Sequence, residues 1–331
     1  MTRLDVAASS SAELAARINP RETPGSQQPP RPVSVRRRYW TVRTRREAVI
    51  FLAFALPNIA LIVLFTYRPL LTNLYYSTLD WTLGSANAVS VGLGNYVEFF
   101  SSSAAVDVLG VTALFTAATV GGAMGLGLLI ALALNLRVRG RGFARAAVFA
   151  PYVLSGVGVG LVWLFIFDPV YGALSWVLRA VGAASPQWIN DPNLALVMVI
   201  IVYVWKNLGY CAVVYLAGLQ SMPQDVMEAA ALDGASSARR FFAITLPLLS
   251  PTTFFLLITS LLSSLQAFDI IRIMTPTGSG TNTLIFEAYL QAFSTYNRAG
   301  YSAAISTILF VLLLLVTLAQ LRFVERKVHY S

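Results

Sequence analysis

Charged side chains are scarce in this sequence, and so are the residue types that form disulfides and metal sites. Of the 331 residues, 12% are charged and 56% are hydrophobic, and the mean hydropathy is +0.67. Soluble domains carry about 25% charged residues, so this composition excludes an ordinary soluble fold. A disulfide-rich scaffold is also excluded, because the chain holds one cysteine, Cys211.

Histidine is as rare as cysteine. The single histidine, His329, lies two residues from the C-terminal end. One histidine and one cysteine cannot supply the ligands of a zinc site, and no histidine is placed to activate a serine nucleophile. A phosphate-binding loop ending in Gly-Lys-Ser/Thr is missing too, since GSGTNT at 278–283 has no lysine. We therefore expect no enzyme, metal site or cofactor in this chain, with any ATP hydrolysis on another polypeptide.

Arginines are concentrated at the N-terminal end. The net charge is +9, and residues 1–46 supply +7 of it, because ten arginines stand there against three carboxylates. This segment is rich in Pro, Ser and Gln and has no long apolar run, which is typical of a disordered basic tail. The remainder is nearly neutral, so the charge does not predict a nucleic-acid partner.

Long apolar runs dominate the remainder, residues 47–331. A helix needs about 20 apolar residues to cross the bilayer core, and six runs are long enough, at 48–67, 109–134, 146–167, 194–216, 252–270 and 300–321. The alternating segments of a membrane barrel are missing. The sequence therefore predicts an all-α polytopic membrane protein with six transmembrane helices in contact with membrane lipid.

Basic residues mark alternate connections between these runs. Besides the tail, they gather after the second run, after the fourth and at the C-terminal end, at Arg137, Arg139, Arg141, Arg145, Arg239, Arg240, Arg322, Arg326 and Lys327. The intervening connections hold only Arg68, Arg179, Arg272 and Arg298. Because basic residues are retained on the cytoplasmic side, we expect both termini in the cytoplasm.

The cytoplasmic loop at 217–251 carries helix signals. Ser221 suits a helix start, an alanine-rich stretch favours helix propagation, and Gly234 can adopt the left-handed conformation that ends a helix. A second short helix is expected from about Ser236 to about Leu246. The loop is therefore predicted to be a helix, a glycine bend and another helix that project from the membrane.

This loop resembles the signature of the permease subunits of bacterial ATP-binding-cassette importers. That signature is Glu-Ala-Ala, a glycine six positions after the glutamate, and then Ile-x-Leu-Pro. The matching residues here are Glu228-Ala229-Ala230, Asp233-Gly234, Ile244 and Leu246-Pro247. The resemblance extends over about residues 50–331. Further segments are similar to the first permease of the pair in the carbohydrate-uptake type, at 92–100, 150–163 and 204–223.

The resemblance implies a type I importer fold in a bacterial cytoplasmic membrane. Its coupling helix would seat in a groove of a cytoplasmic ATPase subunit, through Glu228, Ala229, Ala230, Asp233 and Gly234. The implied partners are a second homologous permease, two ATPase subunits that carry ATP and Mg, and an extracytoplasmic substrate-binding lipoprotein. A surface helix without a partner is the alternative for this loop.

Polar side chains interrupt the fourth and fifth apolar runs. With helical spacing, one face of the fourth collects Tyr203, Lys206, Asn207 and Tyr210. One face of the fifth collects Ser260, Ser263 and Ser264. A charge at mid-span costs about 2.5–3.5 kcal/mol, so Lys206 needs water or a counter-charge, for which Asp269 is a candidate. Both faces predict a translocation path for a polyol, and close helix packing is the alternative.

The substrate is the least determined property. The segments 213–235 and 322–330 look most like permeases for glycerol 3-phosphate and its diesters, and permeases for a disaccharide or oligosaccharide such as trehalose or maltose are the runner-up. An ion-coupled secondary transporter and a membrane-embedded enzyme are alternatives of other classes. The importer signature around Glu228 favours the permease.

Overall fold

The computed structural model describes residues 42–136, 139–294 and 296–324, and most of these are helical. The only strands among them are β1 (Leu79–Asp80) and β2 (Val89–Ser90), which form one antiparallel pair. The predicted all-α class is confirmed. The predicted tail at 1–46 lies mostly outside the described residues, and the first helix that the structure describes begins at Val42.

The chain divides into two units, residues 1–60 and 61–331. The described part of the first unit belongs to α2 (Val42–Ile62), which continues through a π-helical turn, η1 (Val63–Tyr67), into α3 (Arg68–Tyr76). Together they form an apolar helix of 31 residues from Arg46, long enough to cross a bilayer.

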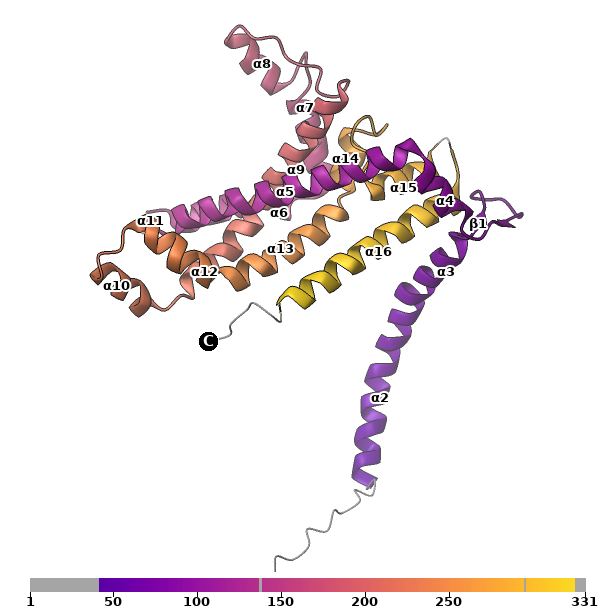
Figure 1. The fold of residues 1–331 in the computed structure, drawn as a ribbon, viewed down its shortest axis with the longest axis horizontal. Helices are drawn as coiled ribbons and strands as arrows, with labels where there is room; N and C mark the ends of the chain where they lie inside the picture. Colours follow the sequence, from indigo (N-terminus) through magenta and orange to yellow (C-terminus); the bar gives the residue numbers. More distant parts are fainter. Residues whose placement is uncertain (1–41, 137–138, 295, 325–331) are drawn as a thin grey trace, which may run out of the picture. The chain divides into compact units, whose positions relative to one another are not determined.

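The second unit contains the other long apolar helices, α5 (Ser103–Asn135), α9 (Pro192–Gln220) and α16 (Ala299–Val324). A fourth segment consists of α13 (Ser250–Leu265) and, after a short break, α14 (Asp269–Met274). These helices are labelled in Figure 1; α9 packs against α5, and α13 packs against both α5 and α16. Capping side chains fix two of the starts, because Ser102 accepts from the backbone of Ala105 and Asp191 from that of Asn193.

The third predicted span is two helices and not one continuous helix. α6 (Arg141–Val153) and α7 (Gly156–Ile166) meet at an angle of 99°. Leu154 and Ser155 between them have extended backbone, and Pro151 lies in the last turn of α6. Proline and Ser-Gly pairs are common causes of such bends. Among the described residues, five helices are long enough to span by themselves, and there are six if the bent pair counts as one span.

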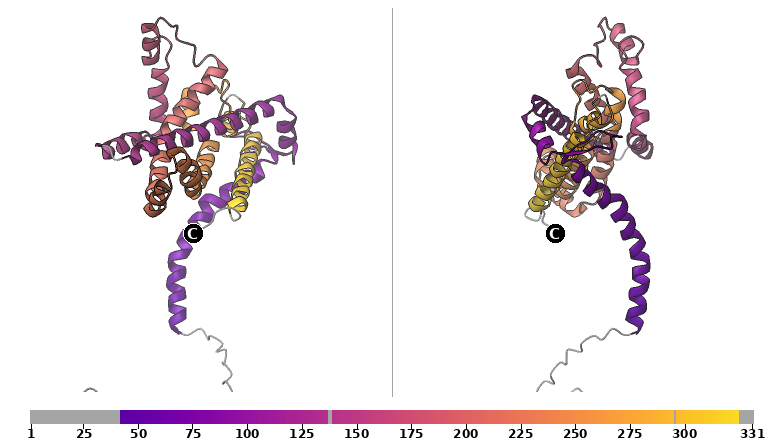
Figure 2. Two further views of the ribbon diagram at one scale, coloured as in Figure 1. Left: turned by 60° about the vertical axis from the view of Figure 1, so that its left-hand side comes forward. Right: turned by 90° about the vertical axis from the view of Figure 1, so that its right-hand side faces the viewer.

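Shorter helices complete the second unit. α8 (Ala173–Ala180) follows α7, α4 (Gly94–Ser101) precedes α5, and α15 (Leu284–Phe293) packs against α16. The left view of Figure 2 places α8 at the opposite end of this unit from the orange-brown helices of the loop at 217–251.

That loop contains the helix, glycine and helix that the sequence predicts. The first helix is α10 (Gln224–Leu232), and Gly234 follows it with a φ of 73°. Ser236 then caps α11 (Ser237–Arg240), which continues through a π-helical turn, η2 (Phe241–Thr245), and α12 (Leu246–Leu248). Ser221 has a different role from the predicted one, because its hydroxyl donates to the Gly218 carbonyl at the end of α9.

An ion pair outside the spanning segments joins α4 to the start of α16. The two terminal guanidinium nitrogens of Arg298 donate to the carboxylate oxygens of Glu98, at 2.7 and 2.6 Å. These hydrogen bonds lower the pKa of Glu98. A lowered pKa means that the stabilisation is present above the ordinary carboxyl pKa and is lost as the pH falls through the lowered one.

Exchanging Glu98 for glutamine is therefore expected to lower stability slightly at pH 7, by about 1 kcal/mol or less, because both side chains are partly exposed. As the pH falls through the lowered pKa of Glu98, the wild-type carboxylate becomes protonated, and the difference should shrink. Thermal melts of both proteins in detergent at pH 7 and pH 3.5 would measure it. A stability difference between the two proteins that is larger at pH 3.5 than at pH 7 would contradict a stabilising ion pair between Glu98 and Arg298.

Candidate functional site

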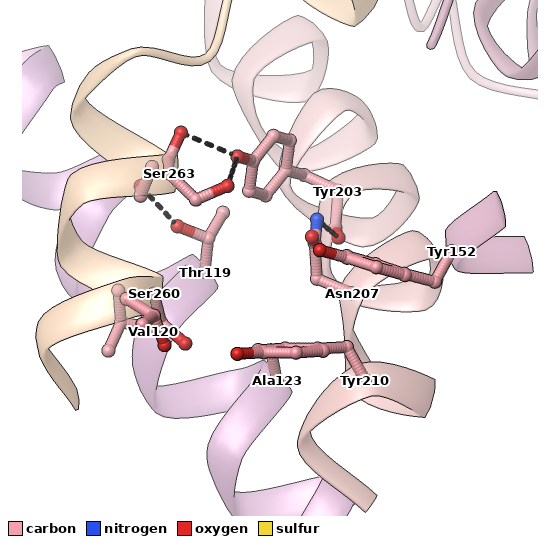
Figure 3. Close-up of a pocket in the computed structure, with 11 residues that line it drawn as sticks. Thr119, Val120, Ala123, Tyr152, Tyr203, Asn207, Tyr210, Ser260 and Ser263 are labelled. Carbon is pink, nitrogen blue, oxygen red and sulfur yellow. Dashed lines mark hydrogen bonds between the residues drawn. The ribbon is translucent and has the colours of Figure 1, made fainter. Parts of the chain in front are cut away.

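A cavity of about 240 Å³ lies between α5, α9 and α13, with one wall from α6. Its lining is polar and aromatic and is drawn in Figure 3. The lining residues are Thr119, Val120, Ala123, Tyr152, Tyr203, Asn207, Tyr210, Thr259, Ser260, Ser263 and Ser264. No charged side chain belongs to this set.

Six of the seven predicted path residues line this cavity. They are Tyr203, Asn207 and Tyr210 from α9, and Ser260, Ser263 and Ser264 from α13. The helical spacing brings each group onto one face, and the packing of the two helices places the faces opposite each other. The Tyr203 hydroxyl donates to the Ser263 carbonyl at 2.7 Å and lies 3.0 Å from the Ser263 hydroxyl. Their role in transport stays a prediction.

Five lining residues do not stand out in the sequence. Tyr152 stacks on Tyr210, with ring centroids 4.9 Å apart and planes 18° from parallel, as Figure 3 shows. Thr119 of α5 forms a buried hydrogen bond of 2.8 Å with Ser264. The only sequence signal for Thr119 is a hydroxyl within an apolar run, which occurs at several other positions. The other three lining residues that the sequence analysis did not predict are Val120, Ala123 and Thr259.

Lys206 lies outside this cavity and lines an adjoining one of about 610 Å³. Its ammonium group donates to the backbone carbonyls of Tyr152 at 2.8 Å and Leu154 at 2.7 Å, and lies 3.5 Å from that of Pro151. Asp269 lines the same adjoining cavity, but no ion pair of 4.0 Å or less joins it to Lys206 among the described residues. Backbone carbonyls are thus the direct partners of the ammonium group, and Asp269 acts on it only by Coulomb attraction at longer range.

The chemistry of the smaller cavity suits a neutral, hydroxyl-rich group. Serine, threonine and tyrosine hydroxyls both donate and accept hydrogen bonds, and the Asn207 amide does the same through different atoms. The faces of the Tyr152 and Tyr210 rings provide apolar surface for carbon-bound hydrogens. Several weak contacts of this kind can hold a solute and release it.

A second candidate region is the loop at 217–251. Glu228 and Asp233 are exposed, whereas Ala230 faces inward. The backbone N–H of Ala235 donates to the Ala230 carbonyl at 3.1 Å, which is the closing bond of a glycine-terminated helix. Leu232, at the end of α10, is 89% exposed.

Glu228 also borders a cavity of about 580 Å³ beneath α10. The other walls come from the ends of α5, α6 and α9, and include Asn135, Arg141 and Gln220. Within the described part of the chain, no group of three or more His, Cys, Asp or Glu side chains could hold a metal ion, and the predicted lack of a cofactor is not tested by this.

Comparison with known families and proteins identifies clear relatives. Residues 123–330 match the family of binding-protein-dependent transport system inner membrane components. The sn-glycerol-3-phosphate transport system permease protein UgpA of Agrobacterium fabrum is 39% identical over 280 residues, which cover 83% of this chain and 94% of the relative. The proteins of the same name from Brucella abortus and Yersinia pseudotuberculosis are 36% and 33% identical over the same shares of the chains.

Solved structures show the same fold. A chain from a bacterial alginate ABC transporter, in complex with a periplasmic protein that holds an alginate pentasaccharide, superimposes with a TM-score of 0.75. The match covers 87% of this chain and 98% of that one, at 22% identity. A second structure of a transporter for the acidic polysaccharide alginate gives the same values.

Proposed function

Because the chain belongs to the family of binding-protein-dependent transport system inner membrane components, we propose that it forms half of the solute path in an ATP-driven importer. A second, homologous permease subunit completes the path. Two ATPase subunits bind ATP and Mg²⁺, and an extracytoplasmic binding protein delivers the solute. The family and the apolar helices make the chain a multi-pass inner-membrane permease. We further propose that both termini lie in the cytoplasm, as the distribution of basic residues predicts.

The proposed solute path runs through the cavity between α5, α9 and α13. The observation that carries this assignment is the convergence of hydroxyl, amide and aromatic groups from three spanning helices around about 240 Å³. Polar groups at membrane depth usually face a cavity or another helix. Within this cavity, Tyr203 and Ser263 connect α9 to α13, so a separation of these helices would change its shape.

The coupling function is assigned to α10 and the glycine bend after it. Exposed Leu232, Val226 and Phe242 lie in this loop, and apolar side chains exposed to water favour a protein partner. We infer that a cytoplasmic ATPase subunit covers them, with Glu228 and Asp233 at the margin. Movement of that subunit is then transmitted through α10 to the ends of α5, α6 and α9.

Glycerol 3-phosphate or a glycerophosphodiester is the proposed solute. The support is that the three relatives described above carry that name and that the alignments cover 94% of their length. The uncharged lining of the cavity favours the second candidate, a disaccharide or oligosaccharide, because that set contains no cation for a phosphate. An ion-coupled secondary transporter is not favoured, since the family is one of binding-protein-dependent systems.

Reconstitution tests both the function and the solute. The chain should be assembled in liposomes with the proposed partners, which are the second permease, the ATPase subunits and the binding protein. We expect saturable uptake of labelled glycerol 3-phosphate that requires ATP. Uptake of maltose or trehalose without any uptake of glycerol 3-phosphate would favour a disaccharide or oligosaccharide as the solute. Uptake by this chain alone, driven by an ion gradient without nucleotide, would overturn the proposed function.

A further inference from the structure

We propose that Lys206 is a positioning residue, which binds the end of α6 and thereby holds Tyr152 in the wall of the cavity, without contact to the solute. This inference rests on the proposed function, because it concerns the cavity as part of a solute path. It differs from the interpretation of Lys206 as a cation that attracts an anionic solute.

The contacts of the ammonium group are the first support. A lysine ammonium group has three N–H donors, and three carbonyl oxygens, those of Pro151, Tyr152 and Leu154, lie within 3.5 Å of Nζ. The donors are therefore directed at the backbone of this chain. The same nitrogen lies 5.6 Å from the centroid of the Tyr152 ring. Lys206 therefore interacts with both the carbonyl and the ring of Tyr152.

The position of these carbonyls explains why a cation belongs there. The last carbonyls of a helix have no N–H partner within that helix, and the C-terminal end carries the negative pole of the helix dipole. α6 ends at Val153, within the span predicted at 146–167, and the axis of α7 is bent by 99° from that of α6. An intact spanning helix would not need this cation. Lys206 thus compensates for the break between α6 and α7.

The adjacent face of α9 holds α6 at two more points. Gly209 lets the backbones approach closely, since a Cβ there would lie 2.0 Å from the Val148 carbonyl oxygen. One residue further, Tyr210 stacks on Tyr152. Lys206, Gly209 and Tyr210 follow each other at helical spacing and face α6. Tyr203 and Asn207 of the same helix line the cavity, and Tyr210 does so as well.

Tyr152 is the connection from this contact to the solute path. It lines both the smaller cavity and the adjoining one that contains Lys206. Loss of the ammonium group would remove a donor from the carbonyls of Tyr152 and Leu154 at membrane depth, which is unfavourable. The end of α6 is then expected to move, and the Tyr152 ring with it.

A double-mutant cycle tests whether Lys206 acts through Tyr152. ATP-dependent uptake should be measured in the reconstituted importer for Lys206→Met, Tyr152→Ala and the double variant. We expect Lys206→Met to lower uptake by about tenfold or more, and the double variant to lie within about twofold of the worse single variant, because the two residues act as one unit. If the uptake loss of the double variant equals the product of the two single losses, Lys206 acts independently of Tyr152, and the proposal is overturned.

The conservative variant and a second solute provide controls. Lys206→Arg keeps donors that reach the carbonyls, so it should retain most of the uptake. Lys206→Met should reduce the uptake of an anionic solute and a neutral solute by similar factors, if the wild type accepts both. A loss restricted to the anionic solute would overturn the proposal.

A structural measurement separates this proposal from the proposed function. Nitroxide labels at two exposed sites, Phe143→Cys in α6 and Val162→Cys in α7, report the angle between these helices by their distance distribution, without any transport. Lys206→Met should broaden or shift the distance distribution, and Lys206→Arg should not. Asp269→Asn should leave the distribution unchanged. If Asp269→Asn shifts it as much as Lys206→Met does, Asp269 is the partner through which Lys206 acts, and the inference is refuted.

If the Lys206→Met complex does not assemble, Lys206→Gln carries the same test. The glutamine amide has N–H donors but no charge. The distance distribution of this variant should therefore differ from that of the wild type, but by less than if the end of α6 had lost every donor from position 206. A distribution identical to the wild type in every Lys206 variant would overturn the positioning role. A failure of uptake in the wild type, with the expected shifts in distance, would refute only the proposed function.

Discussion

Replacing Gly209 by alanine is expected to lower the amount of folded, assembled protein by about tenfold or more, because a close-packed interior has no space for the added methyl group. A Cβ at this position would lie 2.0 Å from the carbonyl oxygen of Val148 and 2.9 Å from its carbonyl carbon. Both atoms belong to the backbone of α6, so only a displacement of that helix relieves the overlap. Size-exclusion chromatography and thermal melts in detergent would measure the loss.

The control for this variant is Gly121→Ala in α5. Gly121 also lies inside a long apolar helix, but a Cβ there meets no atom within 4 Å. Alanine favours a helix over glycine by up to about 1 kcal/mol, so this variant should assemble normally. Normal assembly of Gly209→Ala would contradict the close approach of α6 to α9. Equal losses in both variants would point to a general intolerance of the bundle.

Replacing Gly234 by valine is expected to reduce solute-stimulated ATP hydrolysis of the assembled importer by about tenfold, since left-handed backbone costs L residues about 1–2 kcal/mol. Gly234 has a φ of 73° and ends α10. Without that bend, α10 changes direction relative to α11 and the docking surface is lost. Glu228→Ala should also lower stimulated hydrolysis, while solute binding to the isolated binding protein stays unchanged.

Gly182→Val is the matched control. Gly182 follows α8 with a φ of 78°, and neither it nor Gly234 has an atom within 4 Å of an added Cβ. The substitution therefore imposes a similar backbone strain far from the coupling loop. Stimulated hydrolysis should remain near the wild-type rate. Normal hydrolysis in both Gly234→Val and Glu228→Ala would reject the docking role of α10, and an equal loss in Gly182→Val would assign the effect to reduced stability.

Local signals in the sequence predict much of this protein. The spanning helices follow from hydropathy alone, because a bilayer requires apolar runs whose length is set by its thickness. The loop at 217–251 follows from residues that act within one turn, such as the cap at Ser236 and the left-handed glycine at position 234. Each of these signals depends on neighbours in the sequence. The spacing of Tyr203, Asn207 and Tyr210 likewise predicts a shared helical face.

The break in the third span is only partly encoded in the local sequence. Pro151 and the Ser155-Gly156 pair permit a bend, but apolar composition continues through it, so the run at 146–167 reads as one helix. The close packing of Gly209 on Val148 and the cation at Lys206 accommodate the broken end. Both lie in another helix, more than 50 residues away along the chain.

Amino-acid sequence by itself determined the membrane class, the family signature and which residues are polar within the spans, since these depend on side-chain chemistry and short-range spacing. Tertiary structure decided what Lys206 binds and which side chains complete the cavity. The partners of Lys206 are backbone carbonyls 52 to 55 residues away. Every residue has a carbonyl, so no pattern of side chains could identify the three at the end of α6 that face Lys206.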